Sequence, residues 1–260
     1  MQMKSTMSFL FLLQTLINVV SAFKPPPIPP EDINIYRCRN TGNYTSTNYK
    51  NNLISALSAV AKNIGAHGGF YQSSAGTTEQ VNAVALCPSY LNAFFCESCV
   101  NKSIPLLQKN CPNQKEGVTW VASCMVRYSD RKISGVLDDW VWVHLPKDPI
   151  VAKVRELDQA VSDLASRLQT QAAGGTSLKK FASGNTTYGM EKVDLYAAMQ
   201  CTPDLSKEQC TKCLFSTMLT VHSCCSGKLG ARMLSPNCYF RYDHDQFDNI
   251  DVLPRATSIR

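Results

Sequence analysis

The sequence predicts an α+β protein built from two tandem, disulfide-stapled domains, each with two helices packed on an antiparallel sheet. Three observations lead to this prediction: a repeated cysteine frame, helical periodicity in matching places, and alternating, strand-like segments near the end of each copy. The first frame comprises Cys87, Cys96, Cys99, Cys111 and Cys124. The second comprises Cys201, Cys210, Cys213, Cys225 and Cys238. Equivalent cysteines are all 114 residues apart, so the segments between them have equal lengths in both copies.

The N-terminal residues 1–22 are typical of a secretory signal peptide. Lys4 precedes an apolar stretch at 7–20, and the small residues Ser21 and Ala22 follow it. This stretch is shorter than the ~20 residues that a membrane span requires, which argues against the alternative of an uncleaved anchor. No later segment is apolar enough to cross a bilayer. We therefore expect a secreted, extracellular protein.

The mature chain divides into four further parts. Residues 23–33 are rich in proline and predict an extended leader. The two copies of the frame predict one domain over residues 34–143 and another over 144–250, each of an ordinary size for one small core. Residues 251–260 form a short polar tail.

Each domain is predicted to begin with an amphipathic helix. In residues 51–64 the helical spacing is carried by Leu53, Leu57, Val60 and Ile64. In residues 150–168 it is carried by Val151, Val154, Val161, Leu164 and Leu168. Glycines close to the end of both patterns predict where the helices stop.

A second helix in each copy carries the paired cysteines Cys96 and Cys99, or Cys210 and Cys213. Spacing of i, i+3 places both sulfurs on the same side, so one can tie the helix backward in sequence and the other forward. Ser206 and Gln209 predict a capping box at the start of the second of these helices. The segments 118–128 and 232–242 alternate as strands do.

The secretory destination favours disulfides over metal or redox chemistry at the paired cysteines. Zinc would need two more ligands near each pair, but the histidines follow no metal-ligand spacing. These histidines are His67, His144, His222 and His244. No βαβ pattern surrounds either pair, which argues against a thioredoxin-like enzyme. We therefore expect no metal and no cofactor.

The cysteine frame, the Cys224-Cys225 doublet and the Arg-Tyr after each final cysteine resemble the ginkbilobin-homologous, salt-stress/antifungal domain of plants. Two such domains behind a signal peptide resemble the plant cysteine-rich repeat secretory proteins. The resemblance covers about residues 34 to 250. It implies a five-stranded antiparallel sheet with two helices in each domain.

The resemblance also implies a disulfide pattern. The implied pairs are Cys38 with Cys111, Cys87 with Cys96, Cys99 with Cys124, Cys201 with Cys210, and Cys213 with Cys238. The second copy lacks a counterpart of Cys38, which leaves Cys224 and Cys225 unassigned. They can bridge each other, stay free, or pair between chains. A redox-sensor role would rest on these two cysteines alone, and a fully oxidised bridge that is inert to mild reductant would exclude it.

Three sequons, at Asn43, Asn101 and Asn185, predict sites of N-glycosylation in a secreted chain. The alternative at each site is an unmodified surface asparagine. Asn101 is the least favourable acceptor, because it lies within a predicted helix.

The resemblance also implies a possible ligand, because ginkbilobin is known to bind mannose-type sugars. In ginkbilobin an Asn, an Arg and a Glu bind the sugar. In the first copy Arg39, Val118 and Ser129 stand at the three places, so this copy should not bind sugar in that way. The second copy keeps Arg232 and has Asp243 at the acidic place. These two form the candidate carbohydrate site, and an exposed salt bridge between them is the alternative.

Replacement of the trio favours an extracellular interaction module over a sugar-binding, lectin-like antifungal protein. Its partners would be extracellular proteins or cell-wall glycans of the apoplast, in stress or defence, and the oligomeric state stays open. The formal net charge of +6 has no clustered basic stripe, which argues against nucleic acid.

Large side chains gather near the domain junction, where Trp120, Trp140 and Trp142 predict a buried contact between domains. No catalytic motif stands in a recognisable setting, so we expect no enzyme. Asp138 and Asp139 are predicted to form a solvated turn.

Overall fold

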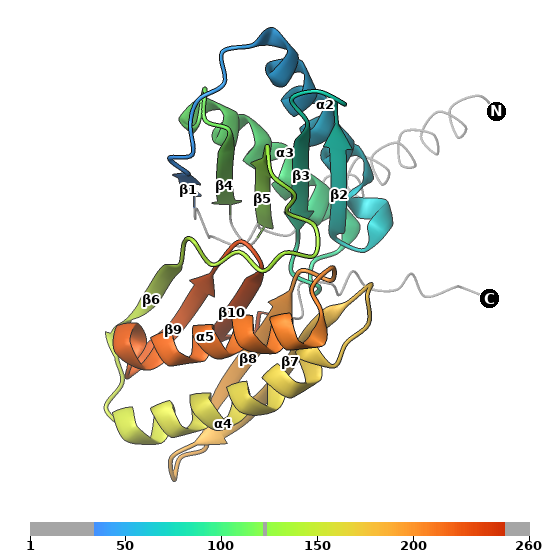
Figure 1. Cartoon of the computed structure of the whole chain (residues 1–260). Coiled ribbons are helices and arrows are strands. Elements are labelled where there is room, and N and C mark those ends of the chain that lie inside the picture. Colours follow the sequence, from blue (N-terminus) through green and yellow to red (C-terminus); the bar gives the residue numbers. More distant parts are fainter. Residues whose placement is uncertain (1–33, 122–123, 248–260) are drawn as a thin grey trace, which may run out of the picture. The chain divides into compact units, whose positions relative to one another are not determined.

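The computed structural model describes residues 34–121 and 124–247. The expected signal peptide (1–22), leader (23–33) and tail (251–260) lie outside the described residues, as do residues 248–250. Two five-stranded antiparallel sheets account for the described strands. Two long helices cover one face of each sheet (Figure 1). The predicted α+β class, with two helices on each five-stranded sheet, is confirmed.

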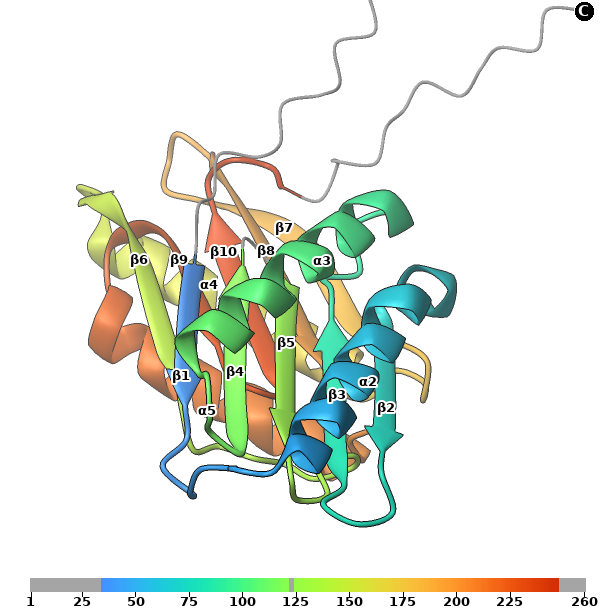
Figure 2. The ribbon, with the colours of Figure 1, turned by 90° about the horizontal axis from the view of Figure 1, so that it is seen from above.

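The first sheet has the strand order β1-β4-β5-β3-β2. Its strands are β1 (Asn34–Cys38), β2 (Phe70–Ala75), β3 (Val81–Leu86), β4 (Glu116–Val121) and β5 (Cys124–Ser129). Its helices are α2 (Thr47–Asn63) and α3 (Ala93–Asn110), and a short 3₁₀ turn, η1 (Gly65–His67), follows α2. Figure 2 shows α2 and α3 lying along one face of this sheet.

The second sheet repeats this topology with the order β6-β9-β10-β8-β7. Its strands are β6 (Val143–Ile150), β7 (Lys180–Tyr188), β8 (Val193–Cys201), β9 (Lys228–Leu234) and β10 (Cys238–Asp243). Its helices are α4 (Val154–Ala173) and α5 (Lys207–Cys225). Both cross the same face of the sheet in Figure 1.

Two helix starts differ from the prediction. Helix α2 begins at Thr47 rather than at residue 51, because the Ser46 side chain accepts a hydrogen bond from the Tyr49 amide and caps an earlier turn. Helix α4 begins at Val154 rather than at residue 150, because Ile150 still pairs with Lys228 in the sheet. The capping box predicted at the start of α5 is present.

Each segment predicted to alternate as strands do forms a hairpin. In the hairpin of β4 and β5, the pair next to the turn is Val121 with Cys124. In the hairpin of β9 and β10, it is Leu234 with Tyr239. The Ser235 amide closes the second turn by donating to the Cys238 carbonyl at 2.9 Å. These hairpins form the centre of each sheet, so their residues are buried almost throughout.

The described cysteines are all paired in disulfides. The structure contains the five pairs that the family resemblance implies, and the sixth is Cys224 with Cys225. The helix α3 is tied in two directions, because Cys96 bonds to the end of β3 and Cys99 to the start of β5. The neighbouring Cys224 and Cys225 bridge each other at the end of α5, which is one of the three arrangements that the sequence allows.

The strand register shows what replaces Cys38 in the second domain. Cys38 lies opposite Gly117 in the first sheet, and the equivalent of Gly117 in the second copy is Ala231. The residue opposite Ala231 is Pro146. A proline therefore stands where the first domain has its longest-range disulfide.

We expect loss of the Cys38–Cys111 disulfide to destabilise the chain more than loss of the Cys87–Cys96 disulfide. The first closes a loop with a sequence separation of 73 and the second one of only 9. Loop-closure entropy gives about 4 kcal/mol for the long loop and nearer ~3 kcal/mol for the short one. Urea unfolding of the two double-alanine variants measures both values. A larger loss for the short loop would show that unfolded-state entropy does not set the order.

Candidate functional site

The structure brings Arg232 and Asp243 onto the same face of the second sheet. Arg232 of β9 lies directly opposite Arg241 of β10, and Asp243 lies two residues beyond Arg241 on that strand. Side chains two residues apart on a strand share a face. Helix α5 packs on the other face, where Phe240 and Tyr242 belong to the core of the second domain. The candidate carbohydrate residues therefore lie on the sheet face that carries no helix.

Asp243 is buried and both of its carboxylate oxygens accept hydrogen bonds. Its Oδ1 accepts from Lys147 Nζ at 2.9 Å and from the Asp245 amide at 3.2 Å. Its Oδ2 accepts from Arg241 Nη2 at 3.2 Å. Burial alone would raise the pKa of Asp243, but these hydrogen bonds and the two positive charges hold that pKa below its usual value. The carboxylate is therefore ionised and engaged.

The alternative of an exposed salt bridge between Arg232 and Asp243 is wrong, because Asp243 is only 5% exposed. Burial, together with the charge of Arg241, lowers the pKa of Arg232 to about 10. The guanidinium of Arg241 also lies 4.1 Å from the ring centre of Phe247, in a cation–π contact. Arg232 and Asp243 thus belong to a larger cluster that includes Lys147 and Arg241.

The first domain has an equivalent cluster, but its carboxylate comes from the opposite strand. Arg127 is the counterpart of Arg241 in the repeated frame, and Ser129 is the counterpart of Asp243. Opposite Ser129 lies Glu116, whereas opposite Asp243 lies Gly230. Each sheet thus pairs one acidic residue with one small residue at this place. A side chain on Gly230 would meet Asp243, so the exchange also satisfies packing.

Glu116 is held by two arginines of the first domain. Arg131 donates to both of its carboxylate oxygens, at 2.8 and 2.7 Å, and Arg39 lies 3.6 Å away. Burial would raise the pKa of Glu116, but the hydrogen bonds and charges of these arginines lower it. Arg39 stands at one of the three replaced sugar-binding places, and here it serves the internal ion pairs of the domain.

The predicted solvated turn at Asp138 is wrong, whereas Asp139 is exposed. Asp138 accepts from Arg127 at 3.0 Å and from Arg39 at 3.1 Å. Its amide donates to Asn237 Oδ1 at 2.9 Å, which links the first domain's charged cluster to the turn between β9 and β10. Asp138 is needed there because Arg127 is almost fully buried and must be neutralised.

An apolar layer joins the helix-free faces of the two sheets, which belong to one compact unit of the chain. Its buried members from the first domain are Val84, Leu86, Tyr90, Val118, Trp120, Met125 and Ile133. Those from the second domain are Val143, Ala198, Leu234, Tyr239 and Phe247. The hydroxyls of Tyr90 and Tyr239 hydrogen-bond at 2.9 Å within this layer. The face with the candidate carbohydrate residues is therefore largely an inter-domain surface.

The three tryptophans take different places around the junction. Trp120 is buried between the two sheets, and Trp140 packs against the same layer from its margin. Trp142 instead packs against the core of the second domain. The prediction of a buried inter-domain contact is confirmed for Trp120, whereas Trp140 and Trp142 are only partly buried.

The three sequons lie in different backbone settings. Asn43 is exposed in the loop before α2, and Asn185 is exposed on the edge strand β7. Asn101 lies within α3, where its side chain donates to the Glu97 carbonyl at 2.9 Å. The hydroxyl of its sequon partner, Ser103, is fully buried and donates to the Cys99 carbonyl at 2.8 Å. The Asn101 sequon is thus part of a packed helix.

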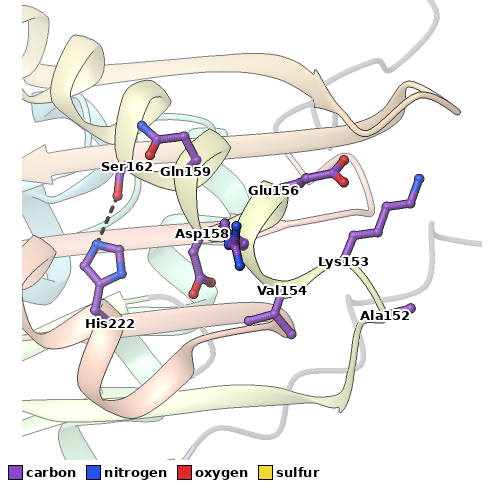
Figure 3. A pocket seen from close by; sticks show the side chains of 9 residues that line it. Ala152, Lys153, Val154, Glu156, Asp158, Gln159, Ser162 and His222 are labelled. Carbon is purple, nitrogen blue, oxygen red and sulfur yellow. Dashed lines mark hydrogen bonds between the residues drawn. The ribbon is translucent and has the colours of Figure 1, made fainter.

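A hollow of about 860 Å³ lies between the start of α4 and the end of α5. Figure 3 shows His222 of α5 facing Ser162 of α4, with Asp158 beside them. The Ser162 hydroxyl lies 3.0 Å from His222 Nε2. Nothing in the sequence marked this place, because its residues have no motif spacing.

No group of three or more potential metal ligands gathers within residues 34–121 and 124–247. Helices in this part of the chain are too short or too polar to cross a membrane. Four charged residues of the two clusters were not predicted from the sequence: Lys147, Arg241, Glu116 and Arg127. The Arg-Tyr repeated after each final cysteine was the signal for the two arginines, whereas Lys147 and Glu116 belong to no repeated pattern.

A family model described as salt stress response/antifungal matches the chain twice, over residues 37–131 and 151–245. Among curated proteins, cysteine-rich repeat secretory protein 38 of Arabidopsis thaliana is 32% identical over 203 residues, which cover 78% of this chain and 80% of that protein. Cysteine-rich receptor-like protein kinase 29 of the same plant is 32% identical over 224 residues, which cover 84% of this chain.

The chain spans only about a third of the receptor-like kinases that it matches, 32% of kinase 29 and 36% of kinase 14. Among solved structures, the tandem DUF26 ectodomain of the Arabidopsis thaliana cysteine-rich receptor-like protein PDLP5 superimposes with a TM-score of 0.65 at 22% identity. The match covers 80% of this chain and 97% of that one. The corresponding ectodomain of PDLP8 gives a TM-score of 0.66 at 20% identity. These structures share the fold.

We expect Asp243→Asn to lower the free energy of unfolding by about 2 kcal/mol at neutral pH, because it leaves buried donors without their charged acceptor. Since the folded-state pKa of Asp243 is lowered, its stabilisation is complete above the unfolded-state pKa of about 3.9 and is lost as the pH falls from there. The difference between variant and parent should therefore shrink in acid. Chemical denaturation at several pH values measures it.

The matched control is Asp245→Asn, since the Asp245 side chain also pairs with Lys147 but is 82% exposed. An exposed pair contributes between about 0 and 1 kcal/mol, so this variant should stay close to the parent. Equal losses for both variants would contradict the importance of the buried carboxylate.

We expect N-glycans at Asn43 and Asn185 and none at Asn101. Asn43 and Asn185 are exposed and lie outside helices, whereas Asn101, although exposed, lies within α3 and its sequon partner Ser103 is buried. Peptide mapping after enzymatic glycan removal identifies each modified asparagine by its conversion to aspartate. Glycan on Asn101 in the secreted protein would contradict this ranking.

Proposed function

The chain belongs to the salt stress response/antifungal family, and from this premise we propose that it acts as an extracellular protein-interaction module in stress or defence. The observation that carries the proposal is an apolar pair, Phe215 and Leu219, on the outer face of α5. Their side chains are 52% and 62% exposed and lie one helical turn apart.

An extracellular location agrees with the names of the relatives, which are called secretory proteins or receptor ectodomains. The disulfides of the chain suit an oxidising environment of this kind. The apoplast is the compartment that we propose.

Binding rather than catalysis is what the family supports, since the relatives include secretory proteins and ectodomains. The charged groups described above serve internal ion pairs, and we assign none of them a catalytic role. The kinase activity in the names of longer relatives is not proposed for this chain, which matches only about a third of their length.

The helices are the surfaces on which we expect a partner to bind. Each sheet has one face under its own helices and much of the other against the second sheet, so the helices provide broad outer surfaces. The inner stripe of α5 supplies Leu214, Thr217 and Val221 to the core. Phe215 and Leu219 lie on the opposite side. Exposed aromatic and aliphatic side chains of this kind commonly anchor protein interfaces.

The lectin-like alternative at Arg232 and Asp243 has less support. A sugar hydroxyl donates to a carboxylate, but both oxygens of Asp243 already accept hydrogen bonds from Lys147, Arg241 and the Asp245 amide. A ligand would have to replace these bonds within a buried cluster. Replacement of charge-assisted bonds by neutral ones is unfavourable.

The test uses biolayer interferometry to measure binding of the secreted chain to tandem ectodomains of cysteine-rich receptor-like proteins. Replacing Phe215 and Leu219 by lysine should weaken a detected interaction at least about tenfold, as expected for hot-spot residues. The control is Met190→Lys, because Met190 is 92% exposed in a turn of the same domain. A partner that binds the parent chain, the variant with lysine at Phe215 and Leu219, and Met190→Lys equally would contradict a role for α5.

A further inference from the structure

We propose that the hollow between α4 and α5 is a binding site for a neutral oligosaccharide. The site belongs to the second domain alone and lies away from Arg232 and Asp243, which are on the other side of the sheet. The inference goes beyond the protein partner proposed above and does not depend on it.

The equivalent corner of the first domain is filled. There the loop before α2 places Tyr44 between the start of α2 and the end of α3. Its ring stacks on Tyr49 with the ring centres 4.6 Å apart, and its hydroxyl donates to the Pro112 carbonyl at 2.8 Å. The Tyr44 amide also donates to the Asn113 carbonyl at 2.8 Å. One aromatic side chain thus closes this corner.

The second domain has a small residue at this place. Cys38 and Pro146 lie at equivalent places of the two sheets, and Tyr49 and Leu157 are the first buried residues of the helices that follow. Both segments have the same length, and Ala152 stands where the first copy has Tyr44. The hollow is therefore a difference between two copies of one fold, and it lies where the first copy has Tyr44.

The floor of the hollow depends on a close backbone approach. Gly227 has a φ of +70°, and a side chain there would come within 2.8 Å of Val154, which lines the hollow. The Gly227 amide donates to Asp158 Oδ1 at 2.9 Å, and the Ser226 hydroxyl donates to Asp158 Oδ2. The turn after α5 and the first turns of α4 thus hold Asp158 at the hollow.

The other polar groups are also held by neighbours. Gln159 donates to Asp163 at 2.9 Å, which leaves the oxygen of its amide available to accept. Ser162 and His222 hydrogen-bond each other across the two helices. Lys153 pairs with Glu191 outside the hollow. Such contacts reduce the side-chain freedom that a ligand would otherwise have to remove.

The chemistry of the lining favours a neutral, polyhydroxylated ligand. Amide, hydroxyl, carboxylate and imidazole groups together supply both donors and acceptors, as sugar hydroxyls require. The cations Lys153 and Arg155 are balanced by Glu156 and Asp158, so the hollow favours neither an acidic nor a basic ligand. Figure 3 shows Lys153 and Glu156 extending on the same side of the helix. The volume of about 860 Å³ falls in the range of small-molecule sites.

The test is a titration of the ¹⁵N-labelled secreted chain with neutral tetrasaccharides of mannose, xylose and glucose, followed by amide chemical shifts. Tetragalacturonate serves as the anionic comparison. We expect at least one neutral tetrasaccharide to shift the amides of Gln159, Ser162 and His222 with a dissociation constant at or below about 1 mM. Tetragalacturonate should bind more weakly.

Gln159→Ala and His222→Ala should each weaken that binding about fivefold to tenfold, in line with the loss of one or two hydrogen bonds. Both side chains are exposed, so the variants should keep the parent's spectrum elsewhere. Gln171→Ala, at an exposed position of the same helix outside the hollow, is the matched control and should bind as the parent does.

Three outcomes would overturn the proposal. They are the absence of shifts at the hollow with every neutral tetrasaccharide, tighter binding of tetragalacturonate than of all neutral ones, and binding that Arg232→Ala abolishes while Gln159→Ala does not. The last outcome would show that the sugar binds at the sheet face that carries Arg232. The protein-partner proposal is measured separately with variants of Phe215 and Leu219, so either result can stand without the other.

Discussion

Burial of both faces of the two sheets is the constraint on which the other features of this chain depend. Helices cover one face of each sheet, and an apolar layer joins the faces that remain. Charged residues on the strands can then persist only where they are neutralised. Arg127 and Arg241 lie at equivalent places of the two sheets, and they meet Asp138 and Asp243 respectively. The sheet face that carries the candidate carbohydrate residues is thus largely covered by the pairing of the two domains.

The same constraint explains why the two copies differ in detail. The acidic residue at the paired place of the central hairpin is Glu116 of β4 in the first domain and Asp243 of β10 in the second, with a small residue opposite in each case. The central arginine pairs with this residue only in the second domain, because Arg127 of the first pairs with Asp138 of the segment between β5 and β6. Both domains neutralise their buried arginines, although the carboxylates stand at different places of the two copies. Both copies thus meet the physical requirement of the buried sheet, while the corner at the helix ends is filled by Tyr44 in the first copy and open in the second.

Local and repeated patterns predicted the fold well. The cysteine frame, the helical spacing and the capping box of Ser206 and Gln209 all depend on residues close in sequence. The charged cluster could not be predicted in this way, because Arg39 and Asp138 are far apart in the chain and meet only when the sheets form. The hollow depends on a small residue, Ala152, at the place of Tyr44, and such an exchange gives no positive signal in the sequence.

The proline that replaces Cys38 has a consequence for the behaviour of the chain in concentrated solution. Strand β6 is at the edge of its sheet, and an edge strand can pair with strands of other molecules. Pro146 and Pro149 remove two N–H groups from this strand, and Lys147 adds a partly exposed charge between them. Prolines and lysines on an edge oppose aggregation through strand addition. Pro146, at the place where the first domain has a disulfide, therefore helps to prevent association between neighbouring molecules.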